Sequence, residues 1–270
     1  MVVTAQPDID SALKASQCVT KTHFALADYL KAGQTMAEID TFVAEVLESL
    51  DCRSAFLRYK IPGHPPFPSH ACLSLNDCIV HGTHDLTDMP LKPGDIFSID
   101  IGVMHKGWVG DAAWTYAIEH ASDDALRLME CGKESLRRGL ATIKPGRPLM
   151  DWARAVHQFV EKESGLFLVK NLGGHGYGRT LHGSPFLSNR MPRHRAEWPD
   201  AFKTFEPGLL LAVEPMLAIG TGETRNAPRS WPIYTADGSL SVHYEADVMV
   251  TEDGVANLTE GMCELPDVVG

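Results

Sequence analysis

The sequence has few cysteines, and no two of them form a Cys-x-x-Cys pair. Six cysteines spread over 270 residues are too few and too scattered to hold a chain of this length together by disulfide bonds. The absence of close cysteine pairs also argues against zinc ribbons and thioredoxin-type redox sites. We therefore expect reduced thiols and a cytoplasmic location.

Long apolar runs and an excess of basic residues are also missing. No stretch approaches the ~18 consecutive apolar residues of a membrane span, and the N-terminus has neither the basic nor the apolar segment of a signal peptide. The formal net charge of -11 argues against nucleic-acid binding, because phosphates require a basic patch. The acidity is dispersed, which is typical of a soluble surface. The remaining composition, with 44% hydrophobic residues, suits a globular enzyme with a sizeable core.

The first fifty residues have the pattern of two helices. Apolar residues recur at helical spacing over Ser11–Leu30, and Gly33 follows as a stop signal. Thr35 and Glu38 then form a Thr-x-x-Glu capping box, which predicts the start of a second helix with one apolar face.

From Ile96 onward the pattern changes to the period of two expected of β-strands. One predicted strand carries Asp100, residues 105–107 supply a turn, and a second strand over Val109–Ile118 carries Asp111. A hairpin would therefore place the two carboxylates on neighbouring strands, with small residues beside each of them.

The second half of the chain repeats this plan. Helical patterns cover Asp123–Leu140 and Leu149–Lys162, and a Pro-Gly-strand unit ending in Glu214 matches the one ending in Asp100 at an offset of 114 residues. The match predicts one α+β domain of two pseudo-symmetric halves, at about 8–120 and 121–257, each giving a carboxylate to a shared centre. Two unrelated Pro-Gly-strand units are the alternative.

Several acidic residues lie within apolar strands, among them Asp100, Glu214 and Glu245. Any one of them alone could simply face solvent. If they converge with Asp111, burial costs several kcal/mol per unpaired ion, in a domain stable by only ~5–15 kcal/mol. Residues 97–103 and 209–216 contain no Lys or Arg, so two divalent cations are the expected counter-charge.

His175 is the imidazole expected to join these carboxylates. It lies in the glycine-rich run at 173–178, which resembles a dinucleotide-binding loop but is not followed by an amphipathic helix. Oxygen-rich ligation with one imidazole suits Mn, Fe(II), Co or Zn. His81 and His182 are further candidates, whereas the following are expected to be structural or exposed: His23, His105, His120, His157 and His194.

Five motifs together resemble the methionine aminopeptidases of type I. They are Asn76–Gly82, Asp100 with Asp111, Gly174–Gly178, Glu214-Pro215-Met216 and Tyr244-Glu245. The resemblance runs from about Asp8 to Asn257, without the long insertion of type II enzymes or an N-terminal zinc-binding extension. It therefore points to the short bacterial kind.

The resemblance implies the pita-bread fold, with two pseudo-symmetric halves around a curved antiparallel sheet and flanking helices. It also implies residue roles. Asp111 and Glu245 would bridge two metal ions, Asp100 would complete one ion, and His175 and Glu214 the other. His81 and His182 would contact the substrate, and Glu214 would also transfer protons.

The same resemblance implies which residues recognise the substrate, because three positions correspond to those that line the family's pocket for methionine. These are Phe67, Cys72 and Trp231, for which ordinary core packing is the alternative. Two departures from the family pattern lie nearby: the 62–68 segment is several residues longer, and Gly183 replaces an acidic residue. Both bear on the choice of the first residue.

The implied activity is removal of the N-terminal methionine from nascent proteins and peptides by a metal-bridging hydroxide. We expect a monomer that binds polypeptide N-termini, with neither membrane nor specific nucleic-acid partners; association with the ribosome stays open. Three alternatives are an inactive binding relative, an aminopeptidase of different first-residue specificity, and an Xaa-Pro peptidase, which usually needs a further domain before the position of Asp8.

Overall fold

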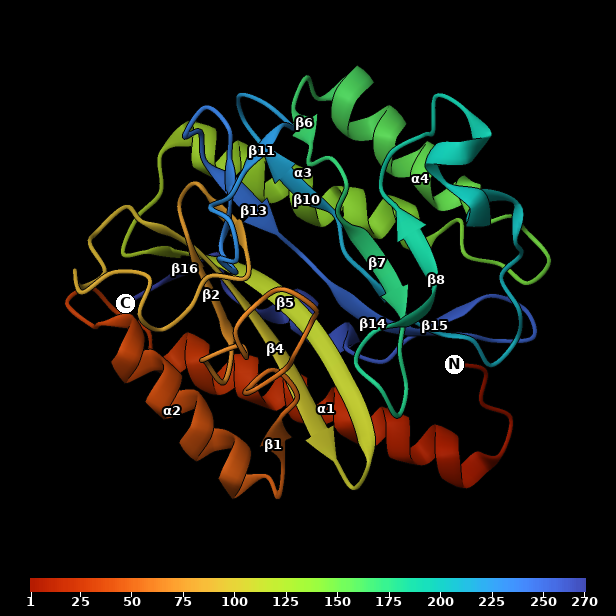
Figure 1. Cartoon of the computed structure of the whole chain (residues 1–270), viewed down its shortest axis with the longest axis horizontal. Helices are drawn as coiled ribbons and strands as arrows, with labels where there is room; N and C mark the ends of the chain where they lie inside the picture. Colours follow the sequence, from red (N-terminus) through yellow and green to blue (C-terminus); the bar gives the residue numbers. More distant parts are fainter.

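The structure, a computed structural model, describes residues 1–270. Two helices open the chain, α1 over Gln6–Tyr29 and α2 over Met36–Ser49. The predicted capping box is confirmed, because the Thr35 hydroxyl accepts from the Glu38 backbone N–H while the Glu38 carboxylate accepts from the Thr35 N–H. Both helices lie along one side of the first sheet (Figure 1).

A long antiparallel hairpin forms the centre of the first half. Strand β4 covers Ile96–His105 and β5 covers Trp108–Ile118, with Lys106 and Gly107 in the left-handed region at the turn, as the sequence predicts. Strand β2, Cys72–Leu75, pairs with β4 so that Cys72 lies opposite Asp100. Short strands complete this sheet: β1 over Arg53–Ser54 and β16 over Val268–Val269.

The second half contributes another helix pair and another five-stranded sheet. Helix α3 covers Asp123–Leu140 and is N-capped by Ser122, and α4 covers Met150–His157. The helix predicted for 149–162 is confirmed as one continuous helical segment, although its winding changes from α to π over Gln158–Glu163. The sheet has the order β15-β14-β9-β7-β8, with these bounds: β7 Gly173–Gly176, β8 Gly183–Ser188, β9 Leu210–Val213, β14 Ala246–Val250 and β15 Val255–Asn257.

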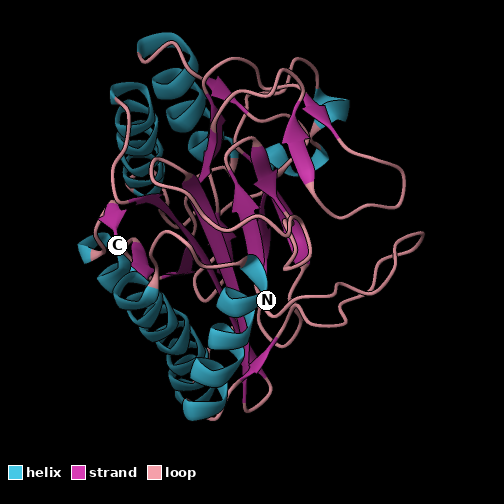
Figure 2. Cartoon of the chain, turned by 90° about the vertical axis from the view of Figure 1, so that its left-hand side faces the viewer, coloured by secondary structure: helices cyan, strands magenta, loops and turns pink.

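Two small sheets complete the strand arrangement, and the second of them pairs strands from both halves. One joins β6 (Phe167–Leu168), β10 (Met216–Ala218) and β13 (Ser241–His243); the other joins β3 (Cys78–Val80), β11 (Thr224–Arg225) and β12 (Ile233–Thr235). Single 3₁₀ turns lie at Arg195–Glu197, Pro199–Phe202 and Glu260–Glu264. Figure 2 shows the long helices on one side of the strands and mainly loops on the other.

The predicted α+β class and pita-bread fold are confirmed. In each half a Pro-Gly turn precedes a central strand, and Gly94 and Gly208 adopt closely similar positive φ angles of 89° and 83°. The segment after β13 runs beside β5, where the Glu245 N–H donates to the Ala113 carbonyl at 3.0 Å. One contiguous apolar core, from Val19 in α1 to Leu211 in β9, spans both halves. None of the helices is long and apolar enough to cross a membrane.

Candidate metal centre

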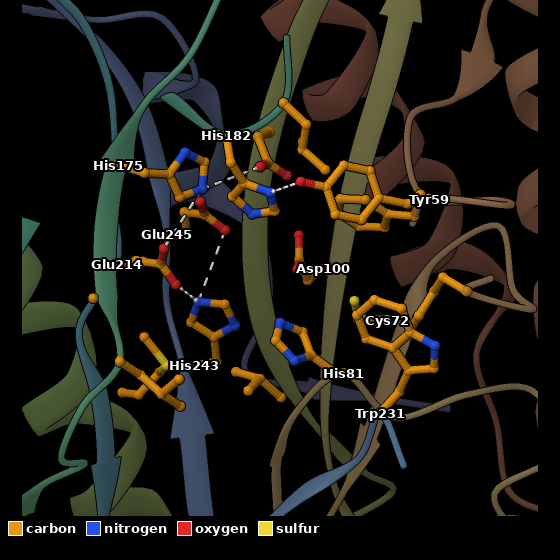
Figure 3. A pocket seen from close by; sticks show the side chains of 18 of the residues that line it. Tyr59, Cys72, His81, Asp100, His175, His182, Glu214, Trp231, His243 and Glu245 are labelled. Atoms are coloured by element: carbon orange, nitrogen blue, oxygen red, sulfur yellow. Dashed lines mark hydrogen bonds and ion pairs between the residues drawn. The ribbon is translucent and has the colours of Figure 1, made fainter. Parts of the chain in front are cut away.

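The five residues expected to hold metal converge at one place in the structure. Asp100 comes from β4, Asp111 from β5 and His175 from β7, whereas Glu214 follows β9 and Glu245 precedes β14. His175 Nε2 lies 3.7 Å from Asp111 Oδ2 and 3.7 Å from Glu214 Oε1. Figure 3 shows the labelled members of this group facing one cavity.

The ligand atoms fall into two groups that share Glu245. One group is Asp111, His175 and Glu245, and the other is Asp100, His243 and Glu245; within each, the atoms lie within 4.8 Å of one another. Glu245 is thus placed to contact two ions. The bridging role predicted for Asp111 and the other ligand roles stay predictions.

The carboxylates lie in surroundings that disfavour their negative charge. Burial raises the pKa of Asp100 to about 7 and raises the pKa values of Asp111, Glu214 and Glu245 well above their usual range. Neither Lys nor Arg lines the cavity. Bound cations would therefore stabilise four ionised carboxylates that nothing else in the cavity neutralises.

The polar atoms of the cavity also fit a metal site. Buried Asp100 Oδ1, Asp111 Oδ1 and His243 Nε2 have no hydrogen-bond partner, and buried polar atoms without partners are rare in folded proteins. Burial lowers the pKa of His175 to about 3, so its imidazole is neutral and free to donate a lone pair. Oxygen ligands with imidazole nitrogen suit Mn, Fe(II), Co or Zn.

Comparison with known proteins agrees with this geometry. Residues 10–252 match metallopeptidase family M24. The chain belongs to this family. It is 34% identical to the methionine aminopeptidase of Aquifex aeolicus over 257 residues, covering 95% of this chain and 97% of that protein. It is also 34% identical to methionine aminopeptidase 1 of Mycobacterium tuberculosis, covering 94% and 93%.

Solved structures give the same result. The crystal structure of methionine aminopeptidase from Rickettsia prowazekii superposes with a TM-score of 0.87 at 28% identity, covering 96% of this chain and all of that one. The resemblance inferred from the motifs is therefore confirmed. As a member of family M24, the chain is a metal-dependent peptidase.

Two further histidines of this M24 peptidase line the same cavity, as the sequence predicts. His81 follows β3 in the left-handed region, with φ of 59°, a conformation that costs energy for a non-glycine residue and is common at functional sites. Burial lowers its pKa to about 4, so it is neutral at pH 7. His182 is exposed at the cavity and its Nδ1 lies 2.7 Å from the Tyr59 hydroxyl.

The cavity of the M24 peptidase continues from the carboxylates into an apolar recess. It has a volume of about 370 Å³, and Phe67, Cys72 and Trp231 line it, as the sequence predicts. Gly183 lines it as well. Burial raises the pKa of the Cys72 thiol, which therefore stays protonated and is a poor metal ligand.

The 62–68 segment contributes directly to this recess. The Trp231 indole N–H donates to the Pro65 carbonyl at 2.9 Å, and the His64 ring lies 5.2 Å from that of Trp231. Phe67 meets the same indole edge-on, with ring centroids 5.2 Å apart. The segment thus fixes one wall of the recess.

Sequence reasoning missed two residues of the site, Tyr59 and His243. Tyr59 carries no sequence signal, since its contact with His182 joins positions far apart in the chain. His243 does carry one, because it lies two positions before Glu245 in an apolar segment. The period of two would have placed both side chains on one face.

Proposed function

We propose that this M24 peptidase removes the N-terminal methionine from peptides and nascent proteins with two divalent metal ions. One observation carries the proposal: two ligand groups share Glu245 at one end of a cavity whose other end is apolar. The curated relatives named as methionine aminopeptidases, which it matches over nearly their whole length, support the same activity.

The residues divide the work of holding metal. Asp111 and Glu245 would contact both ions, Asp100 would hold one ion, and His175 with Glu214 would hold the other. Divalent ions held by these residues would supply Lewis acidity, which would acidify the attacking water, orient the substrate amine and polarise the scissile carbonyl. Asn189 supports this arrangement, because its side-chain amide donates to the Glu214 carbonyl at 2.8 Å.

Proton transfer and substrate positioning fall to one of these ligands, Glu214, and to two histidines beside them. Glu214 accepts the proton of the attacking water and passes it on. His81, neutral and rigidly placed, donates a hydrogen bond to the departing amide nitrogen. His182 holds the carbonyl oxygen, and the Tyr59 hydroxyl fixes the orientation of its ring.

The apolar recess receives the first side chain of the substrate. An unbranched, flexible thioether fits a pocket walled by aromatic rings, and sulfur–aromatic contacts add about 0.3–1.5 kcal/mol. The hydrogen bond from Trp231 to the Pro65 carbonyl fixes the indole that forms one wall of this recess. We propose that the chain acts in the cytoplasm as a monomer on emerging polypeptide N-termini.

A peptide panel tests the proposal. Metal-free protein would be assayed on Met-Ala-Ser and on peptides that vary the first and second residues, with Co(II), Mn(II), Fe(II) or Zn(II) added separately. We expect methionine release with at least one metal and none after chelation. Absence of release with every metal would favour an inactive binding relative, and release of another first residue would favour a different specificity.

A further inference from the structure

His243 lies inside the metal centre, although neither the motifs nor the comparisons assign it a role. It ends β13 and precedes Glu245 by two residues, and both side chains line the same cavity. Its Nε2 lies 3.2 Å from Glu214 Oε2 and 3.8 Å from Glu245 Oε2. Figure 3 shows His243 beside Glu214, with its ring facing the carboxylates.

The ring of His243 is held in place but its Nε2 has no partner. Thr115 fixes the backbone, because its hydroxyl lies 3.1 Å from the His243 N–H and donates to the His243 carbonyl at 2.9 Å. The side chain is 3% exposed, and Nε2 is buried without a hydrogen bond even though Glu214 is near. Such an atom needs a partner that the protein itself does not supply.

The geometry points to His243 as a nitrogen ligand of the metal ion on the Asp100 side, together with Asp100 and Glu245. The ligand atoms of these three residues lie within 4.8 Å of one another, like those of Asp111, His175 and Glu245. The inference rests on the metal centre of the proposed function. It adds a second imidazole, so that each ion has one nitrogen ligand.

A second imidazole changes which metals the centre prefers. A site of carboxylate oxygens alone suits hard ions such as Mn(II), whereas imidazole favours Co(II) and Zn(II). His243 therefore makes the Asp100 side more selective for Co(II) and Zn(II) over Mn(II). The competing role for His243 is to donate an Nε2–H hydrogen bond to Glu214 and so orient that carboxylate.

X-ray absorption and calorimetry distinguish the two roles. The fully Zn(II)-loaded wild-type protein should show one imidazole per ion, and His243→Gln should show half that number. In the variant, the affinity for one of the two Zn(II) or Co(II) ions should fall by more than ~100-fold. Loss of a residue that only hydrogen-bonds to a ligand typically lowers metal affinity by ~10–100-fold. Its Mn(II) affinity should change much less. The exposed His120→Gln variant is the control and should match wild type.

Three results would overturn the inference. The first is a wild-type spectrum with only one imidazole per pair of ions. The second is unchanged metal affinity in His243→Gln. The third is an equal loss of affinity for every metal in that variant, which would indicate that His243 orients Glu214. The wild-type spectrum alone decides the question if the variant folds poorly. If the loaded protein shows two imidazoles per pair of ions but releases no methionine, His243 is a metal ligand and the proposed function is wrong.

Discussion

At the scale of single residues, burial decides the chemistry of the site. It raises the pKa values of Asp111, Glu214 and Glu245 and lowers that of His175 to about 3, so carboxylates and imidazole are both driven toward neutral forms. A bound cation would reverse this preference for the carboxylates.

His81 provides the first residue-scale prediction. His81→Ala should lower kcat by ~10²–10⁴-fold, because a positioned acid–base group is lost, while two metal ions remain bound. Steady-state kinetics on Met-Ala-Ser, with elemental analysis of the same sample, measures both quantities. A normal kcat in the variant would exclude His81 from the mechanism.

Sequence patterns predicted most of the site because side chains in a β-strand alternate between its two faces. The alternation around Asp100 and Asp111 showed which face each occupies, and β4 and β5 pair as expected. His182 and Trp231 depended on the family motifs, since only the folded chain brings them to the cavity. His243 was missed because each histidine was considered alone, without asking which acidic residue shares its face of a strand.

At the scale of secondary structure, the centre depends on how closely α1 packs against β5. Small residues line the contact: a Cβ placed on Gly110 would lie 2.6 Å from the carbonyl carbon of Ala15 in α1. Asp111 is the next residue, and its N–H donates to Asp247, which also accepts from Ser16 in α1. The helix thus supports the strand that carries Asp111, a predicted metal ligand.

Gly110→Ala tests this packing. The added methyl group cannot be accommodated without moving α1 away from β5, so the free energy of unfolding should fall by about 1–3 kcal/mol. Urea unfolding would measure the change. Gly254→Ala is the matched control, because no atom lies within 4 Å of its new Cβ. Equal stability of the two variants would contradict the packing argument.

The sequence predicted long elements better than short ones. Helix α2 lies where its apolar spacing and capping box placed it, and α3 where its apolar spacing did, whereas α1 begins at Gln6, before the predicted start at Ser11. The strands of the two small sheets were only partly predicted, because a strand of two or three residues is too short to show an alternation of apolar and polar side chains. Their positions depend on pairing between distant segments, as when Ile233 pairs with Val80.

At the scale of the whole molecule, stability should depend on pH through buried histidines. His23 is fully buried between α1 and β5, its Nε2–H donates to the Ala112 carbonyl, and burial lowers its pKa from 6.5 to about 4. The folded state therefore resists protonation of this ring. Its contribution is complete above pH 6.5 and is lost as the pH falls toward 4.

We expect His23 alone to account for about 2 kcal/mol of lost stability between pH 7 and pH 5. Urea unfolding of the wild-type protein and of His23→Gln at both pH values measures it. The variant should lose less stability over this interval than the wild type. An identical loss in both proteins would contradict the assignment.

The central claim is that this centre holds two metal ions between the halves of the molecule, and a titration of metal-free protein tests it most directly. Calorimetry with Co(II), checked by elemental analysis, should give two equivalents for the wild-type protein. Asp111→Asn should lose bound metal, because bridging two cations requires both oxygens of a charged carboxylate. Two equivalents retained by Asp111→Asn would refute the bridging assignment, and fewer than two in the wild type would contradict the dinuclear centre itself.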